Sequence, residues 1–397
     1  MAMTPRSVAI VGASLAGLSA VRALRSEGYT GTITVIGDEP HMPYDRPPLS
    51  KEFLSGDDSN VALLDEAAGE TDALGATWLL GLRATGISSV GIGHEVQTDD
   101  GTSVRADAVI IATGARARTL PGADALDGVH TLRTFDDARA LRKSLASARR
   151  LVVIGAGFIG AEVASSAAAI GLEVTVVEVS PEPLAGVLGA HVGSLCAARH
   201  RANGVGLLTG VTVEKLLGTT AVTGVELGNG LVLRADAVVI GIGAIPNVEW
   251  AAESGLEIAN GFVTDALCRT TIDGIYAIGD CARSFDEELG AHHRSEHWTN
   301  ATTQAKTAAR TIMGASHPPQ AAPYFWSNQY DKRLQFAGRR RRTDEVKFVD
   351  GDADTASFTV VYERDGEVVA VFAMDNPRLF TRYRKNLERG RRATVQR

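Results

Sequence analysis

The sequence predicts an α/β fold in which two parallel-sheet units are followed by a small C-terminal α+β segment. Glycine-rich turns at 12–17 and 155–160 each follow a short apolar run and precede a helix-forming stretch. A third stretch, from about Pro323, contains strand-like runs at 357–362 and 368–372 and ends in a basic helical segment. Strand, glycine turn, helix and strand in this order are typical of Rossmann-like, dinucleotide-binding domains.

The second glycine turn belongs to the more regular of the two units. Its helix carries apolar residues at helical spacing, and the next buried strand ends in Glu178, 23 residues after Gly155. A carboxylate at this place can bind both hydroxyls of an adenosine ribose, while the glycines and the helix N-terminus receive the pyrophosphate. The residues predicted to bind the dinucleotide here are Gly155, Gly157, Phe158, Ile159, Gly160 and Glu178.

The first glycine turn is a variant of the same motif. Ser14 replaces its middle glycine and is small enough to let a phosphate approach. The strand that follows, 32–36, is succeeded by Gly37, so Asp38 is the predicted ribose ligand, with Glu39 close behind. Two such units in one chain imply two cofactors, or one cofactor and one cosubstrate. The predicted residues of this turn are Gly12, Ser14, Leu15, Ala16 and Gly17.

Two further stretches indicate ligand binding. Three prolines between Pro43 and Lys51 predict a rigid, extended loop suited to hold Arg46 and Lys51 against an anion, although many such loops are plain connectors. A later apolar run ends in Asp280, whose carboxylate suits the hydroxyls of a sugar or polyol.

Composition and charge exclude several classes of protein. No apolar run approaches the roughly 20 residues that cross a bilayer, and polar residues interrupt the N-terminal apolar stretch, so neither a membrane span nor a signal peptide is expected. The cysteines Cys196, Cys268 and Cys281 form no CxxC pair, which favours a reducing, cytoplasmic location. A net charge of −7 argues against general nucleic-acid binding, although 323–397 hold 16 Lys+Arg against 11 Asp+Glu.

Six short motifs then identify a family resemblance. They are PYDRPPLSK at 43–51, ATG at 112–114, GAGFIGAEVA at 155–164, GIGAIPN at 241–247, AIGDCA at 277–282 and YFWSNQYD at 324–331. With these motifs in order, nearly the whole chain resembles the FAD-dependent, NADH-linked ferredoxin reductases that serve oxygenase systems. The resemblance implies a glutathione-reductase-like arrangement, with an FAD-binding domain at 1–115 and 246–322, an NAD-binding domain at 116–245 and a C-terminal α+β reductase domain at 323–397.

The resemblance also implies roles for individual residues. Lys51 and Glu162 are expected to pair near flavin N5, where a cation stabilises charge that develops on reduction. The alternative is a loop lysine and a surface glutamate that never meet. A helix starting near Thr299 and Asn300 is expected to point its N-terminus at flavin O2. Further implied FAD contacts are Arg46, Ala84, Ala112, Thr113, Gly114, Arg133, Gly279, Asp280 and Trp298, and further NAD contacts are Glu162, Gly243, Glu296 and Trp326.

The expected function is therefore an oxidoreductase that passes electrons from NADH through FAD to a [2Fe–2S] ferredoxin, which feeds a haem monooxygenase or a Rieske dioxygenase. A rubredoxin reductase, or another NADH:acceptor flavin reductase, is the alternative. A disulfide reductase or a flavoprotein peroxidase needs a cysteine near the flavin, and the loop 43–51 contains none. A further alternative is an NADH-sensing, nucleic-acid-binding flavoprotein resembling apoptosis-inducing factor, which would bind nucleic acid through the arginines at 339–342. The overall negative charge of the chain argues against this alternative.

Two last expectations concern a metal site and a docking surface for the partner protein. His292, His293 and His297 have no cysteine or suitable fourth ligand nearby, so no metal site is expected. Ferredoxins of this type are usually acidic, so docking is expected where positive charge gathers. The predicted docking residues are Arg339 and Arg340, together with the tail 378–397, which contains eight Lys+Arg and one Glu. A solvated basic patch is the alternative.

Overall fold

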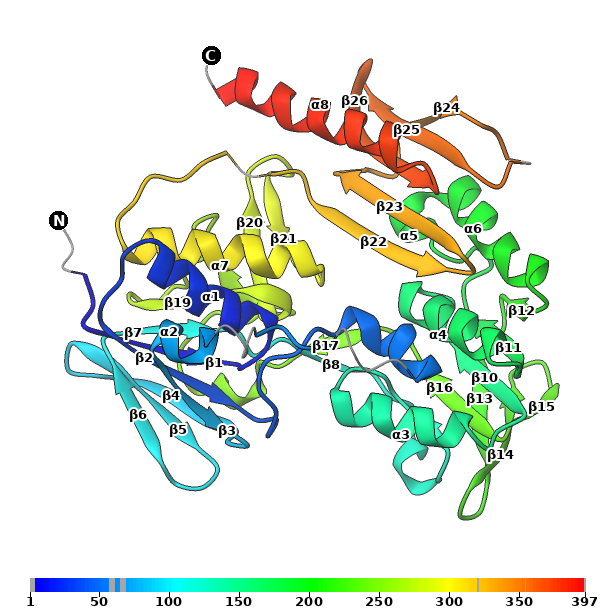
Figure 1. Cartoon of the computed structure of the whole chain (residues 1–397), viewed down its shortest axis with the longest axis horizontal. Helices are drawn as coiled ribbons and strands as arrows, with labels where there is room; N and C mark the ends of the chain where they lie inside the picture. The colour runs from blue at the N-terminus through cyan, green and yellow to red at the C-terminus, as the bar shows by residue number, and fades with distance from the viewer. Residues whose placement is uncertain (1–3, 57–60, 65–68, 320, 354, 396–397) are drawn as a thin grey trace. The chain divides into compact units, whose positions relative to one another are not determined.

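The computed structural model of the chain describes residues 4–56, 61–64, 69–319, 321–353 and 355–395 (Figure 1). The chain forms two compact units, each assembled from three segments. The first comprises Met1–Asp45, Ala62–Arg116 and Ile245–Gln320, and the second comprises Arg46–Val61, Ala117–Ala244 and Ala321–Arg397. The segment 46–61, expected within the FAD-binding domain, thus lies in the same unit as most of the predicted NAD-binding and C-terminal domains.

The first unit is built on a parallel sheet of five strands in the order β19-β7-β1-β2-β3. These strands are β1 (Ser7–Val11), β2 (Thr32–Gly37), β3 (Ala76–Leu80), β7 (Ala108–Ile111) and β19 (Ile275–Ala277). Strand β1 pairs in parallel with both β2 and β7, so the carboxyl ends of the three strands meet at one edge. Ligands of open parallel sheets bind at this edge.

The two faces of this sheet carry different layers, because successive side chains of a strand point to opposite sides. Val8 and Ile10 pack with α1 (Leu15–Ser26) and α7 (Trp298–Ile312), which lie side by side (Figure 1). Ala9 and Val11 pack against an antiparallel sheet of β4 (Ala84–Val90), β5 (Gly93–Thr98) and β6 (Ser103–Ala106). The smaller elements are α2 (Glu70–Leu74), β18 (Phe262–Thr264), β20 (Ala282–Asp286), β21 (Ala291–His293) and the 3₁₀ turns η5 (Glu249–Ala251) and η6 (Gly279–Cys281).

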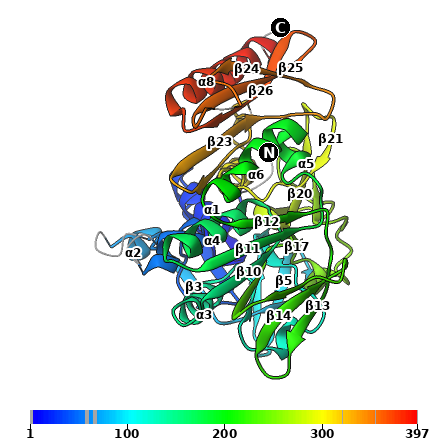
Figure 2. The same cartoon turned by 90° about the vertical axis from the view of Figure 1, so that its right-hand side faces the viewer.

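The second unit repeats this plan with a parallel sheet in the order β12-β11-β10-β16-β9. Its strands are β9 (Val129–His130), β10 (Arg150–Ile154), β11 (Glu173–Glu178), β12 (Gly206–Thr209) and β16 (Ala237–Ile240). One face carries α3 (Phe135–Leu145), α4 (Phe158–Ala169) and α6 (Ala190–Ala202), and Figure 2 shows α4 beside β11. The other face carries β13 (Val213–Gly218), β14 (Val222–Leu227) and β15 (Val232–Arg234). Two of the five crossings between the units fall within β8 (Ala115–Ala117) and β17 (Ala244–Pro246), and η4 (Ala123–Ala125) follows β8.

The C-terminal segment adds an antiparallel sheet to the second unit, in the order β22-β23-β26-β25-β24. Its elements are β22 (Tyr324–Gln329), β23 (Lys332–Gly338), β24 (Glu345–Asp350), β25 (Phe358–Arg364), β26 (Glu367–Met374) and helix α8 (Pro377–Val395). Val371 and Ala373 of β26 pack with Phe380 of α8. Phe372 and Met374 face the other way, toward α6 and the short helix α5 (Ala185–Leu188). The sheet is therefore buried on both faces and shares a core with the dinucleotide-binding part of the unit.

The structure confirms the predicted α/β fold class, including the small antiparallel-sheet segment at the C-terminus. The proline-rich loop is an exception, because the predicted extended conformation is wrong for part of it. Pro47–Ser50 forms the 3₁₀ turn η1, and Glu52–Ser55 forms η2. The fixed φ of proline suits the first turn of a helix as well as an extended chain, and here the helical alternative is adopted.

Candidate functional site

The glycine turn of the second unit leaves the carboxyl end of β10. The N–H of Gly155 donates to the Val177 carbonyl at 2.7 Å. A Cβ on Gly155 would lie 2.3 Å from the Gly241 carbonyl oxygen, and one on Gly160 would lie 2.1 Å from the Gly155 carbonyl oxygen. At Gly157, by contrast, a Cβ would meet no described atom within 4 Å. The outer glycines thus allow close backbone packing and the middle one leaves room for a ligand, the division of roles expected of a pyrophosphate site.

Helix α4 begins directly after this turn, at Phe158. The Phe158 ring packs against Phe325, with 4.8 Å between ring centroids, whereas the neighbouring Ile159 is 46% exposed. Of the two predicted ligand contacts, Ile159 is therefore the more exposed beside the turn, whereas Phe158 is half-buried.

Glu178 ends β11 and turns back toward the glycine turn. Its carboxylate accepts one hydrogen bond from the Ala156 N–H at 2.7 Å and another from the Ser180 N–H at 2.8 Å. These two bonds fix a negative charge beside the turn, where the adenosine ribose is predicted to bind. The residues that follow, Val179 to Pro183, contain no Arg or Lys that could receive a 2′-phosphate.

We therefore expect kcat/KM for NADH to exceed that for NADPH by about a hundredfold, which corresponds to about 2.7 kcal/mol of differential binding. Replacing Glu178 with alanine should narrow this ratio to less than about tenfold, because the charge that repels the 2′-phosphate is removed. Glu182→Ala, at an exposed carboxylate of the same loop, is the matched control and should leave the ratio unchanged. Steady-state kinetics with both coenzymes measure the ratio, and an unaltered ratio in Glu178→Ala would contradict this role.

Three turns converge in the first unit, at the carboxyl ends of β1, β7 and β19. A Cβ on Gly12 would lie 2.1 Å from the Ala112 carbonyl oxygen, and one on Gly279 would lie 3.1 Å from the Ala16 Cβ. Gly279 also has a φ of +72°, which favours glycine, and its N–H donates to the Gln304 side chain at 2.7 Å. The structure thus brings together the predicted residues of the first turn, of 112–114 and of 279–280. This closely packed backbone edge fits the pyrophosphate and sugar portions of a dinucleotide such as FAD.

The ribose ligands predicted for this first unit follow β2, which ends at Gly37. Asp38 is exposed, and Glu39 accepts a hydrogen bond of 2.5 Å from the Tyr44 hydroxyl. Ala84 is buried at the start of β4. The contacts of these three residues with FAD stay predictions.

Helix α7 begins at Trp298, one residue before the predicted start, and His297 rather than Thr299 or Asn300 occupies the N-cap position. Burial lowers the pKa of His297 to about 4, although the nearby Asp280 carboxylate acts in the opposite direction. The imidazole is therefore neutral at neutral pH. Any positive charge at the N-terminus of α7 then comes from the helix dipole and not from His297. The indole N–H of Trp298 donates to the Asp45 carboxylate at 2.8 Å, which fixes the ring.

Lys51 and Glu162 form a buried ion pair within the second unit. Their Nζ and Oε2 atoms are 2.7 Å apart, and the side chains are only 12% and 3% exposed. Lys51 follows η1 and also donates to the Pro47 carbonyl at 2.7 Å, whereas Glu162 lies in the first turns of α4. The alternative in which this lysine and glutamate never meet is wrong. The pair places a desolvated cation on the loop expected to face the flavin.

Arg46 and Arg133 also come together. The Arg46 guanidinium donates to the Arg133 backbone carbonyl, just before α3. The Arg133 N–H in turn donates to Asp137, whose side chain takes part in the capping box of α3 with Thr134. Arg46 is thereby held at a helix N-terminus, and the contacts of both arginines with FAD stay predictions.

The remaining predicted NAD contacts belong to different units of the chain. Gly243 has a φ of +100° and no described atom within 4 Å of a built Cβ. Glu296 pairs with Arg294 at 2.6 Å in the first unit. Trp326 lies on β22 in the second unit and stacks on Tyr324, with ring centroids 5.7 Å apart. A shared role of Glu296 and Trp326 at the nicotinamide stays a prediction.

Two serines that the sequence did not single out bind Glu162. Ser50 Oγ donates to Oε2 at 2.5 Å, and Ser327 Oγ donates to Oε1 at 2.7 Å. Both lie inside motifs that carry the family resemblance, PYDRPPLSK and YFWSNQYD. Their position within those motifs was the available signal, but no local pattern links either serine to a glutamate more than 100 residues away.

The two predicted docking arginines do not form an exposed patch. Arg339 is only 8% exposed, and its backbone is held by a hydrogen bond to Val369. Arg340 is half-buried, with its guanidinium 5.7 Å from the ring centroid of Tyr362 and within hydrogen-bond distance of the Gly186 carbonyl. Burial of Arg339 therefore argues against the docking role predicted for it, and a docking role of the half-buried Arg340 stays a prediction. Reversing their charges would disturb packing, so it would not test docking alone.

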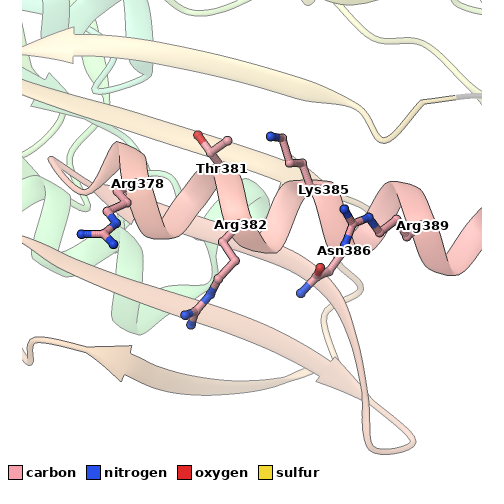
Figure 3. A pocket seen from close by; sticks show the side chains of 6 residues that line it. All are labelled: Arg378, Thr381, Arg382, Lys385, Asn386 and Arg389. Atoms are coloured by element: carbon pink, nitrogen blue, oxygen red, sulfur yellow. The ribbon is translucent and has the colours of Figure 1, made fainter.

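The basic tail, in contrast, presents positive charge to solvent. Helix α8 turns Phe380, Tyr383 and Leu387 toward the sheet. Its opposite face is exposed and lines a surface hollow of about 310 Å³ (Figure 3). The residues that line this hollow are Arg378, Thr381, Arg382, Lys385, Asn386 and Arg389, and we call them the α8 basic face. Side chains beyond Arg389 lie outside the described residues.

Among the described residues, no helix is both long enough and apolar enough to cross a membrane.

Comparison with known proteins agrees with this geometry. Residues 6–305 match the pyridine nucleotide-disulphide oxidoreductase family, and 324–397 match the reductase C-terminal family. Rhodocoxin reductase of Rhodococcus erythropolis is 41% identical over 377 residues, which cover 94% of this chain and 87% of that protein. A ferredoxin–NAD(P)(+) reductase of Sphingomonas sp is 39% identical over 376 residues, covering 94% of this chain and 90% of that protein.

A solved structure gives the same result. Putidaredoxin reductase, crystallised as a covalent complex with putidaredoxin, superposes with a TM-score of 0.91 at 34% sequence identity, over 96% of this chain and 93% of that one. With both dinucleotide turns, the buried lysine–glutamate pair and the C-terminal sheet in place, the chain belongs to the pyridine nucleotide-disulphide oxidoreductases and, among them, to the FAD-dependent, NADH-linked ferredoxin reductase family.

Proposed function

We propose that this chain is a cytoplasmic flavoprotein that passes electrons from NADH through FAD to a [2Fe–2S] ferredoxin, which then feeds an oxygenase. The observation that carries the proposal is the buried ion pair of Lys51 and Glu162. Lys51 of this pair lies at the end of the loop 43–51, where a disulfide reductase would need a cysteine. The cysteines Cys196, Cys268 and Cys281 are all free and buried elsewhere. A protein with this loop supplies a fixed positive charge to the flavin and no thiol.

The residues divide the task between the two units. The turns at Gly12 and Gly155 would hold the pyrophosphates of FAD and NADH. When bound, FAD takes up two electrons from NADH and releases them one at a time. Lys51 would stabilise the negative charge that forms near flavin N5, and Glu162 offsets the unfavourable burial of the lysine. Because His297 is neutral, the positive charge at the N-terminus of α7 comes from the helix dipole, which would favour negative charge at flavin O2.

The acceptor is proposed from the family and from the α8 basic face. Rhodocoxin reductase, the Sphingomonas reductase and putidaredoxin reductase are all named for reduction of a small carrier protein or ferredoxin, or solved with one. A ferredoxin of the acidic kind would be attracted by four exposed cations, Arg378, Arg382, Lys385 and Arg389, which follow one another at three or four residues along one helix face. We therefore propose this face, in place of Arg339 and Arg340, as the docking surface.

Anaerobic reduction of a panel of carriers tests the acceptor. With NADH as donor, we expect kcat/KM for acidic [2Fe–2S] ferredoxins to exceed that for rubredoxins at least about tenfold. The absorbance of each carrier reports its reduction, and NADH-dependent reduction of ferricyanide checks that the flavin is active in every assay. If a rubredoxin were reduced fastest, the chain would be a rubredoxin reductase. If no carrier were reduced while ferricyanide was, the proposed function would be refuted.

A further inference from the structure

Glu162 is a buried carboxylate that two separate segments of the second unit, 46–61 and 321–397, supply with hydrogen bonds. Its Oε2 accepts from Ser50 Oγ at 2.5 Å and from Lys51 Nζ at 2.7 Å. Its Oε1 accepts from Ser327 Oγ at 2.7 Å and from the Asn328 N–H at 3.4 Å. A carboxylate that is 3% exposed needs such donors to remain charged in the interior. Each oxygen has two donors, so both the position and the rotation of the carboxylate are fixed.

Ser327 donates its only hydroxyl proton to Glu162, because a carboxylate can only accept, and the Ser327 oxygen in turn accepts from a second neighbour. The amide Nε2 of Gln329 donates to Ser327 Oγ at 3.0 Å. Ser327 and Gln329 are 0% and 3% exposed, so no solvent competes for these bonds. In this series of hydrogen bonds Gln329 donates to Ser327, and Ser327 donates to Oε1 of Glu162. Lys51 binds the other carboxylate oxygen, Oε2.

The hairpin that carries Ser327 is itself anchored on the dinucleotide-binding part of the unit. At its turn, Tyr330 and Asp331 adopt φ values of +48° and +66°. The Tyr330 N–H donates to Ser165 Oγ on α4, and the Tyr330 hydroxyl lies 2.7 Å from Nδ1 of His200 on α6. Burial lowers the pKa of His200 to about 4, so the imidazole stays neutral and this contact persists at neutral pH. The turn thus holds β22 against the same helix that carries Glu162.

We propose that Ser327, with Ser50, is a positioning residue of the reductase reaction. The two serines hold opposite oxygens of the Glu162 carboxylate, and this carboxylate fixes the Lys51 ammonium at one place. A charge stabilises a reaction only where it is held before the reaction begins, and a shift of about 1 Å can lower a rate about a hundredfold. The C-terminal sheet thus contributes a residue to electron transfer from NADH. This inference rests on the proposed role of Lys51 beside the flavin.

Ser327→Ala in the FAD-loaded enzyme tests the inference. We expect the limiting rate of flavin reduction by NADH to fall about tenfold, equivalent to about 1.4 kcal/mol, with the Kd for NADH changed less than about twofold. We also expect the midpoint potential of the bound flavin to become more negative, because a less well-placed cation stabilises the reduced flavin less. Ser50→Ala, which removes the donor to the other oxygen, should shift both quantities in the same direction.

Thr359→Val is the matched control. Thr359 is a fully buried hydroxyl residue of the same sheet, on β25, and its Oγ1 has no hydrogen-bond partner among the described residues. This variant should keep the wild-type rate and potential, because it removes a buried hydroxyl without reaching Glu162. Thermal melting of every variant separates loss of folding from loss of positioning. If Ser327→Ala does not fold, Ser50→Ala decides.

The outcomes distinguish this inference from the proposal on which it rests. Wild-type rate and potential in both serine variants, together with a slow Lys51→Met, would overturn the positioning role and leave the role of Lys51 intact. Wild-type rate and potential in Lys51→Met would overturn both. A slow Ser327→Ala whose flavin potential equals that of the wild type would also reject positioning of the charge.

Discussion

Replacing Lys51 with methionine is expected to slow the limiting rate of flavin reduction by NADH about a hundredfold, equivalent to about 2.7 kcal/mol. Methionine has a similar length and fits an apolar site but carries no charge, so the stabilisation of developing negative charge is lost. The Kd for NADH should change less than about threefold, because the residues predicted to hold the coenzyme are those of the glycine turn and Glu178, not Lys51. Anaerobic stopped-flow measurements over a range of NADH concentrations separate the limiting rate from the Kd.

Stability must be separated from chemistry in this test. Lys51→Met leaves the buried Glu162 without its ionic partner, and breaking a buried pair costs about 3–5 kcal/mol. The double variant Lys51→Met/Glu162→Gln removes the unpaired charge and should regain much of the lost thermal stability. It should nevertheless reduce flavin as slowly as the single variant. A double variant that recovered the wild-type rate would show that Lys51 acts through folding alone, and an unchanged rate in Lys51→Met would place the lysine outside the reaction.

Reversing two charges on the α8 basic face, with Arg382→Glu and Lys385→Glu, is expected to lower kcat/KM for an acidic [2Fe–2S] ferredoxin about thirtyfold at low ionic strength. Both side chains are exposed and lie outside the buried cluster that contains Phe380, although the Arg382 guanidinium is 5.4 Å from the ring centroid of the partly buried Tyr383. The effect should appear mainly in KM and fade as added salt brings the Debye length to about 10 Å at 0.1 M. Ferredoxin kinetics over a salt series provide the measurement.

Two controls make the docking test specific. NADH-dependent ferricyanide reduction should be unchanged in the α8 variant, because a small acceptor needs no docking surface. Arg139→Glu with Lys143→Glu reverses two exposed charges on α3 and alters the net charge of the protein equally. If the α3 variant lost as much ferredoxin activity as the α8 variant, overall charge rather than this face would steer the partner. Equal kinetics in the wild type and the α8 variant at every salt concentration would reject the docking surface.

The sequence by itself was sufficient for several features that depend on residues close together in the chain, although not for the conformation of Pro47–Ser50. The turn at Gly155 needs small residues, an apolar strand before it and a helix after it, all within about 25 residues, and β10, α4 and β11 form there as predicted. The basic, amphipathic character of α8 is likewise a property of one continuous segment, which is why this part of the docking prediction agrees with an exposed face. The pairing of Lys51 with Glu162, by contrast, came only from the family resemblance.

Tertiary structure decided the features that depend on which segments meet. Ser327 lies 165 residues after Glu162, and only the seating of the β22–β23 hairpin on α4 and α6 brings its hydroxyl to the carboxylate. The same holds for Arg339, which looks like part of a solvated run of arginines. Pairing of its backbone with Val369, and a hydrogen bond from Arg364 to its carbonyl, bury it instead. Burial and hydrogen bonding are set by neighbours distant in sequence, and no local pattern of residue types specifies those neighbours.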